Sequence, residues 1–205
     1  MTLAKNHLPV KLLDAQKRKS PGLEFAGATH STEFPEHVTP LILAAQCRNY
    51  EAVGLLVARG HAIDRPHPPH CACDDCKSLA HDDPLNASSA RLSVYRAISS
   101  PAYLVHMESD PILAAFRLSA ELNANATAYR HFSAAYLALK AEVSAFPVDL
   151  ISCCRTSEEV EIILKQTSGS RGRRHFVLPR LLMAVDYKQK EFVAHPNTQQ
   201  VRLFS

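Results

Sequence analysis

Three cysteines within six positions constrain the fold of this chain more strongly than any other feature of its sequence. Cys71, Cys73 and Cys76 form a C-x-C-x2-C pattern in the stretch RPHPPHCACDDCKS, and His67 lies four residues before the first of them. Thiolates and a neutral imidazole are ligands that zinc prefers, and four such ligands complete a tetrahedral site. The prolines on both sides of His67 stiffen the segment. The sequence therefore predicts a tight turn held by one structural zinc ion.

The fourth ligand has two histidine candidates. His70 is adjacent to Cys71, and a tetrahedron that included both residues would be strained, so we favour His67. Four protein ligands leave no coordination position for water, which a catalytic zinc would keep, and the sequence offers no clear general base. We therefore predict a non-enzymatic chain with a structural metal. The alternative interpretation is that the cysteines are ordinary reduced thiols in a loop; Asp74 and Asp75 are interpreted as solvated loop residues.

The other cysteines do not join this cluster by spacing. The N-terminus lacks the uninterrupted apolar segment of a signal peptide, which indicates a reducing compartment and free thiols rather than disulfides. Cys47 follows a predicted helix and is expected to be a small buried hydrophobic residue. Core packing is also favoured over redox chemistry for Cys153 and Cys154. We interpret His195, in the segment FVAHPN, as a satisfied surface or interface histidine rather than a catalytic base.

A regular segment precedes the cysteine cluster, VTPLILAAQCRNYEAVGLLVARGHAID at residues 38–64. Pro40 predicts the first turn of a short helix with a small-residue face, a second helix is expected at Tyr50–Ala58, and Gly60 ends it in a left-handed conformation. The pattern resembles an ankyrin repeat, with an isoleucine in place of the usual histidine. One repeat cannot bury its own apolar face. Because no second repeat is readable upstream, we expect exposed apolar surface near residues 38–45 and a tendency to aggregate.

The rest of the chain predicts helices and almost no strands, and the expected fold class is all-α, a solenoid-like stack. Helices are expected over residues 10–19, 88–98 and 132–146, from Ser109, from Thr156, and over 179–193. An acidic residue before a first-turn proline marks the start near Ser109. Pro147 is expected to interrupt a helix, and Thr156 with Glu159 forms a capping box. A basic loop, SGSRGRR at residues 168–174, precedes the last helix.

Composition argues against two classes of function. The net charge of +3 is small and dispersed, aromatic residues make up 7% of the chain, and tryptophan is absent. The chain therefore offers neither the basic stripe nor the stacking platform of a nucleic-acid-binding protein. No run of about 18 apolar residues occurs, so we expect no membrane-spanning segment.

Several blocks occur in an order and at spacings that resemble the cytosolic N-terminal region of TRPC-type transient receptor potential cation channels. The similarity extends from Val38 to about Gln200 and includes VTPLILAAQCRNYEAVGLLVARG, RPHPPHCACDDC, YRAISSPAYL, ESDPILAAFRLSAEL, RTSEEVEIIL and YKQKEFVAHPNTQQ. Arg91 and Tyr95, in LNASSARLSVY, are also retained. The zinc site of that family, His-x3-Cys-x-Cys-x2-Cys, falls on His67, Cys71, Cys73 and Cys76.

The resemblance implies a last ankyrin repeat followed by a helical linker domain. The expected parts are an irregular segment at 1–37, an ankyrin-like repeat at 38–64, a zinc-stapled linker helical domain at 65–167, and a basic loop with a pre-membrane helix at 168–205. The chain would then be an assembly and regulatory module of a calcium-permeable channel at the cytoplasmic side of the plasma membrane. Its partners would be other channel subunits, tetrameric in the family, and cytosolic regulatory proteins.

The resemblance leaves two forms of this function open. The sequence ends at VRLFS, before any pore segment of the family, so we expect a truncated or modulatory subunit. The alternative is a free-standing adaptor with a structural zinc, whose ankyrin and helical surfaces bind another protein.

Overall fold

The computed structural model of the chain describes residues 35, 37–82, 84–166 and 178–203. The chain divides into two units, Met1–Pro35 and Glu36–Ser205, and the second unit holds the helices described below. These helices are α2 (Pro40–Gln46), α3 (Tyr50–Ala58), α4 (Asp74–Asp82), α5 (Pro84–Ile98), α6 (Pro101–Met107), α7 (Pro111–Ala128), η1 (Arg130–Phe132), α8 (Ser133–Ser152), α9 (Ser157–Leu164), α10 (Pro179–Asp186), α11 (Lys190–Ala194) and α12 (Pro196–Leu203). No strand occurs among the described residues, in agreement with the predicted all-α class.

The helix pair that was predicted ahead of the cysteine cluster is present. α2 begins at Pro40, directly after Thr39, whose hydroxyl accepts a hydrogen bond from the Ile42 amide at 3.2 Å. α3 spans the predicted residues and is capped by Asn49, and Gly60 beyond it has a φ of +86°. Glycine adopts this left-handed conformation at little cost, because it has no Cβ. The two helices and their ends are thus confirmed, whereas their kinship with ankyrin repeats stays a prediction.

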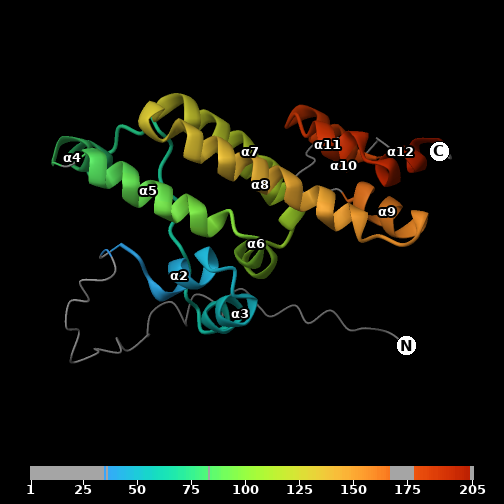
Figure 1. Cartoon of the computed structure of the whole chain (residues 1–205), viewed down its shortest axis with the longest axis horizontal. Coiled ribbons are helices and arrows are strands. Elements are labelled where there is room, and N and C mark those ends of the chain that lie inside the picture. The colour runs from blue at the N-terminus through green and yellow to red at the C-terminus, as the bar shows by residue number, and fades with distance from the viewer. Residues whose placement is uncertain (1–34, 36, 83, 167–177, 204–205) are drawn as a thin grey trace. The chain divides into compact units, whose positions relative to one another are not determined.

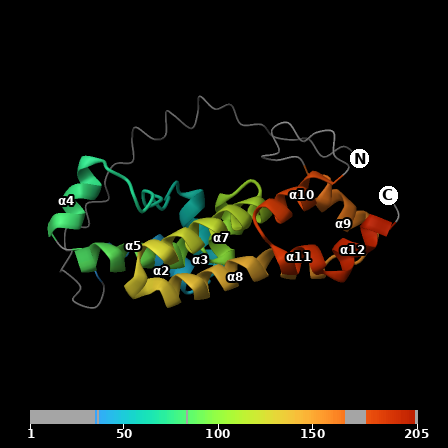
Figure 2. The same ribbon diagram turned by 90° about the horizontal axis from the view of Figure 1, so that it is seen from above.

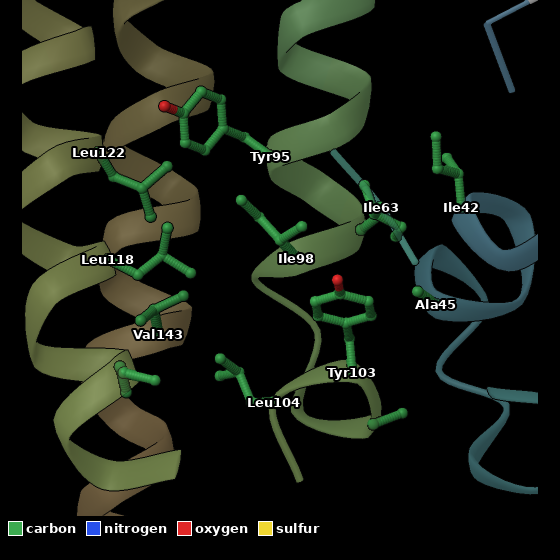
Figure 3. Packing of buried hydrophobic residues seen from close by; sticks show 14 of the residues in the cluster. Ile42, Ala45, Ile63, Tyr95, Ile98, Tyr103, Leu104, Leu118, Leu122 and Val143 are labelled. Atoms are coloured by element: carbon green, nitrogen blue, oxygen red, sulfur yellow. The ribbon is translucent and has the colours of Figure 1, made fainter. Parts of the chain in front are cut away.

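α5 and α6 cover the helix pair. α2 packs on α5 and α3 packs on α6, so that α5 and α6 lie between the pair and the α7–α8 hairpin (Figures 1 and 3). Leu41, Ile42 and Ala45 of α2 are buried in the resulting core. The expectation of exposed apolar surface near residues 38–45 is therefore wrong, because helices later in the chain provide the cover that further repeats would give. Large exposed apolar side chains of the pair lie on α3, at Tyr50 and Leu55.

A substitution at Ala45 tests this packing. Ala45 has no solvent exposure on α2, the helix that packs on α5. Ala45→Leu forces additional carbon atoms into filled space and is expected to lower the free energy of unfolding by about 1–3 kcal/mol. The matched control, Ala58→Leu at the exposed end of α3, is expected to change it by no more than about 0.5 kcal/mol. Urea denaturation followed by circular dichroism measures both variants, and equal effects would contradict the packing.

The centre of the unit is the hairpin of α7 and α8, which η1 connects. Leu118 and Leu122 of α7 and Val143 of α8 are buried and face α5 and α6 in the core (Figure 3). α7 begins where the sequence predicted, with Asp110 as its cap: the Asp110 carboxylate accepts a hydrogen bond from the Leu113 amide at 3.0 Å. α5 also includes the predicted helix at 88–98 but begins four residues earlier, at Pro84.

Pro147 does not interrupt α8, contrary to the prediction, and the helix continues to Ser152. A proline inside a helix removes one backbone hydrogen bond. Here Phe146, Pro147 and Ile151 are all buried, with Phe146 in the core cluster of α5 to α8 and Ile151 in a second cluster that α9 to α12 complete. The helix is therefore packed on both sides of the proline, and this burial outweighs the lost hydrogen bond.

α9 to α12 gather at one end of the α7–α8 hairpin (Figures 1 and 2). The predicted capping interaction opens α9: the Thr156 hydroxyl accepts from the Glu159 amide at 3.2 Å, and the Glu159 carboxylate accepts from the Arg155 amide at 2.7 Å. The single helix predicted over 179–193 is wrong, because α10 ends at Asp186 and α11 begins at Lys190. Lys188, between them, adopts a left-handed conformation with a φ of 57° that a helix cannot accommodate.

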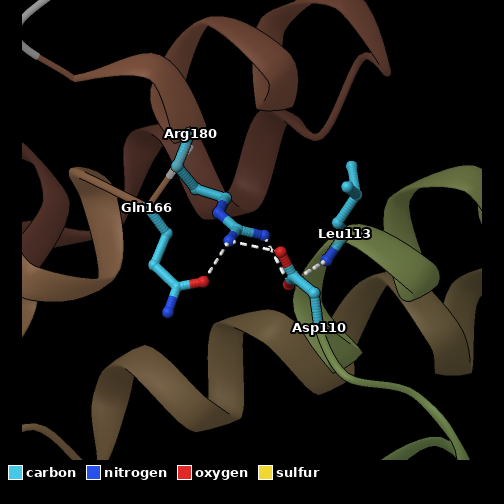
Figure 4. A network of polar contacts seen from close by, with 4 residues as sticks. All are labelled: Asp110, Leu113, Gln166 and Arg180. Carbon is cyan, nitrogen blue, oxygen red and sulfur yellow. Dashed lines mark hydrogen bonds and ion pairs between the residues drawn. The ribbon is translucent and has the colours of Figure 1, made fainter. Parts of the chain in front are cut away.

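A buried ion pair joins α10 to the start of α7 (Figure 4). Both terminal nitrogens of the Arg180 guanidinium donate to the Asp110 carboxylate at 2.6 Å, and one of them also donates to the Gln166 side-chain oxygen at 3.1 Å. The Arg180 side chain is 1% exposed and that of Asp110 is 11% exposed. Asp110 therefore has two functions, as the cap of α7 and as the counter-charge of a buried arginine.

Three expectations lie wholly or almost wholly outside the described residues, namely the irregular segment at 1–37, the helix at 10–19 and the basic loop at 168–174. None of the described helices combines the length and the apolar character that a bilayer crossing requires.

Candidate metal centre

The four predicted zinc ligands lie together. The Nδ1 atom of His67 is 3.2 Å from Cys73 Sγ, 3.4 Å from Cys76 Sγ and 3.5 Å from Cys71 Sγ. All four ligand atoms are within 4.8 Å of one another. The cysteines are half-buried and the histidine is exposed, so the cluster lies at the surface of the second unit.

The local backbone explains why the ligands meet. The Cys71 amide donates to the Pro68 carbonyl at 3.0 Å, which closes a turn directly after His67. α4 begins at Asp74, so Cys73 precedes the helix and Cys76 lies in its first turn, where the Cys76 amide points at Cys73 Sγ at a distance of 3.5 Å. Backbone amides at a helix N-terminus have no carbonyl partner within the helix and favour a negatively charged neighbour.

The same contacts shift the pKa values of the Cys73 and Cys76 thiols in opposite directions. The hydrogen bond from the Cys76 amide, followed by contacts with the Cys76 and Cys71 thiols and with His67, lowers the pKa of Cys73 to about 7. The shared hydrogen bond with Cys73 raises the pKa of Cys76 to about 11, and burial adds to this increase. The thiolate is the form that binds a metal. The metal-free cluster therefore holds one thiol that ionises readily, and a dication would have to displace the protons of its neighbours.

The cluster fits a tetrahedral metal site by donor chemistry and by spacing. With zinc–sulfur bonds of about 2.3 Å and a zinc–nitrogen bond of about 2.0 Å, tetrahedral geometry separates sulfur from nitrogen by about 3.5 Å. Of the three distances from His67 Nδ1 to sulfur, the one to Cys71 equals this value and the other two lie slightly below it. His70 is not part of the group, and Asp74 and Asp75 are exposed and outside it. Asp74 instead lies 3.9 Å from the Lys77 ammonium.

We call residues 67–76, which carry the four candidate ligands, the metal turn. Arg91 of α5 connects this turn to the helical core, a role that spacing in the sequence does not reveal. Its guanidinium donates a hydrogen bond to the backbone carbonyl of His67 and lies 5.4 Å from the ring centroid of Tyr129. The ring of Tyr129 packs against Tyr136, and Tyr136 makes an edge-to-face contact with Tyr95 at 5.7 Å. Arg91 and His67 are 24 residues apart, so only the fold brings them together.

The remaining cysteines are more exposed than predicted. Cys47 is exposed rather than buried: it lies directly after the last turn of α2, where its backbone amide caps that helix. Cys153 is also exposed, so core packing is wrong for this residue. Cys154 is half-buried against the second core cluster, and this burial raises the pKa of its thiol. His195 is half-buried and its Nδ1 atom accepts from the Asn197 amide at 3.2 Å, which agrees with the interpretation of a satisfied histidine.

Comparison with known proteins identifies relatives of the chain. Residues 71–133, which begin at Cys71 and extend through η1, match the family model "Transient receptor ion channel II". Short transient receptor potential channel 3 of Homo sapiens is 40% identical over 174 residues, which cover 82% of this chain and 19% of that protein. The chain is thus a relative of the short transient receptor potential channels. The resemblance inferred from the sequence blocks is confirmed.

Further relatives extend this result. Short transient receptor potential channel 4 of Mus musculus is 39% identical over 173 residues, which cover 83% of this chain and 18% of that protein. The transient-receptor-potential-like protein of Drosophila melanogaster is 40% identical over 171 residues, which cover 82% of this chain and 15% of that protein. The chain therefore spans about a fifth or less of the length of these curated relatives, and its similarity to them covers most of its own helical unit.

Proposed function

We propose that this chain is a non-enzymatic assembly and regulatory module of a transient receptor potential channel. The similarity to short transient receptor potential channel 3 over 82% of the chain carries this proposal. The all-helical unit supports it, because packed helices present broad surfaces for protein contacts, and Tyr50 and Leu55 leave apolar side chains exposed on α3. Its partners would be channel subunits and cytosolic regulatory proteins, at the cytoplasmic side of the plasma membrane.

A structural zinc ion completes the proposal. His67, Cys71, Cys73 and Cys76 would hold the ion, because their ligand atoms converge and match the donors that zinc prefers. Four protein ligands leave no position for substrate, so the ion would hold the turn between α3 and α4 in place rather than support a reaction. The same proposal includes an ankyrin-like repeat formed by α2 and α3. In this repeat, α5 and α6 pack where a neighbouring repeat would otherwise pack.

Association with a channel subunit tests the proposed function. The tagged chain is co-expressed with human short transient receptor potential channel 3, recovered by affinity purification, and the whole-cell current is recorded. We expect the channel to co-purify at several times the background of a tagged, unrelated helical protein, and the current amplitude to change. Recovery at background with an unchanged current would contradict the proposal and favour the free-standing adaptor.

A further inference from the structure

We propose that Arg91 is the residue that positions the metal turn, by holding the His67 ligand in place and by offsetting the charge of the occupied cluster. This inference rests on the proposed zinc site and adds a residue from outside the ligand set. Arg91 lies one helix away from the turn, on α5, and its guanidinium donates to the backbone carbonyl of His67. It therefore bonds to the same residue whose imidazole faces the three sulfurs.

The Arg91 guanidinium is fixed by its own surroundings. Arg91 is half-buried, and its guanidinium lies over the ring of Tyr129 at 5.4 Å, a distance typical of a cation–π contact. Tyr129 packs in turn against Tyr136, whose side chain has no solvent exposure. A planar group held on an aromatic face loses little conformational freedom when it forms a hydrogen bond. The carbonyl of His67 is thus held by a rigid donor, although the His67 side chain is exposed.

A second side-chain contact of this segment, outside the ligand cluster, is weaker. Arg65 lies 3.6 Å from the Glu108 carboxylate, with side chains that are 48% and 37% exposed. Exposed pairs of this kind contribute at most about 1 kcal/mol. On the other side of the turn, α4 packs on the start of α5. Among the described residues, Arg91 therefore provides the side-chain hydrogen bond from a core helix to a ligand residue.

Charge gives Arg91 a second function. A zinc dication with three thiolates and one neutral imidazole has a single net negative charge. The Arg91 guanidinium is always protonated and contacts a ligand residue, so its positive charge stabilises the occupied cluster. Residues that contact metal ligands typically change metal affinity by about tenfold to a hundredfold when they are mutated.

Zinc affinity, measured by competition with a chromophoric chelator on the full chain, tests this inference. We expect Arg91→Met to weaken zinc binding by about tenfold to a hundredfold. Arg91→Lys keeps the charge but not the planar group on Tyr129, and we expect a smaller loss of about threefold to tenfold. Tyr129→Leu removes the ring that holds the guanidinium and should also weaken binding. The matched control is Arg96→Met, at an exposed position on the same helix. We expect the zinc affinity of this variant to lie within about threefold of that of the unmodified chain.

Two further measurements separate positioning from general stability. The visible absorption spectrum of the cobalt-substituted chain reports the geometry of the ligands, and we expect it to change in Arg91→Met but not in Arg96→Met. The melting temperature of each metal-free variant shows whether the core is intact. If metal-free Arg91→Met does not fold, the zinc affinity of Arg91→Lys is used instead. A weaker zinc affinity than that of the unmodified chain supports the inference, and an unchanged zinc affinity overturns it.

The possible failures are distinguishable. If the unmodified chain binds zinc tightly and Arg91→Met binds it equally well, with an unchanged cobalt spectrum, the inference about Arg91 is overturned and the zinc site stands. If the unmodified chain binds no zinc, the proposed zinc site is wrong and the inference is overturned with it.

Discussion

Removal of zinc by chelation, or the substitution Cys73→Ser, is expected to lower the melting temperature of this chain by roughly 8–16 °C. A ligand that binds only the folded state stabilises it by about 4 kcal/mol when its free concentration is a thousandfold above its dissociation constant. For a domain of this size, about 1 kcal/mol shifts the melting temperature by roughly 2–4 °C. The turn around Cys73 has an exposed histidine and half-buried cysteines, so it has little apolar burial to hold it without the ion.

Differential scanning calorimetry with and without chelator, together with elemental analysis of the purified chain, measures this effect. The matched control is Cys47→Ser, since Cys47 is exposed and outside the cluster, and this variant should melt like the unmodified chain. A melting temperature that chelator leaves unchanged, together with a preparation that contains no zinc, would refute the structural metal.

The second large effect is expected at the buried ion pair. Asp110→Asn keeps a residue that can cap α7 but removes the charge that Arg180 requires, and should lower the free energy of unfolding by about 3–5 kcal/mol. The cost is high because the Arg180 guanidinium, 1% exposed, would be left buried without its counter-charge. Asp110→Ala should cost about 1 kcal/mol more, because the cap is also lost.

A surface pair provides the control for burial. Arg48 and Glu142 are 2.7 Å apart, close to the distance of 2.6 Å between Arg180 and Asp110, but their side chains are 58% and 54% exposed. Glu142→Gln is therefore expected to cost no more than about 1 kcal/mol. Guanidinium chloride denaturation measures all three variants. A similar cost for Asp110→Asn and Glu142→Gln would show that burial does not determine the strength of the pair.

Features determined by a few neighbouring residues could be predicted from the sequence. The starts of α2, α7 and α9 follow from Thr39, Asp110 and Thr156, because a capping side chain bonds an amide only three residues away. The convergence of His67, Cys71, Cys73 and Cys76 belongs to the same class, since these residues span ten positions and chain geometry alone restricts how they can meet.

Features that depend on distant residues could not be predicted. The ion pair of Asp110 and Arg180 joins residues 70 positions apart, and no local pattern indicates it. The continuity of α8 through Pro147 depends on packing against two separate clusters, which overrides a local preference to end the helix. The burial of α2 likewise depends on α5, and the sequence alone indicated only that some cover was required.

The hairpin of α7 and α8 has a consequence for how the second unit unfolds. α7 contributes Leu118 to one core cluster and Phe116 to the other, and α8 contributes Val143 and Ile151 in the same way. Neither cluster can be exposed to water completely while both helices stay intact. The two ends of the unit therefore belong to one cooperative transition, with the slowest amide exchange in α7 and α8. The metal turn, with its exposed histidine and half-buried cysteines, can open locally at a lower free-energy cost.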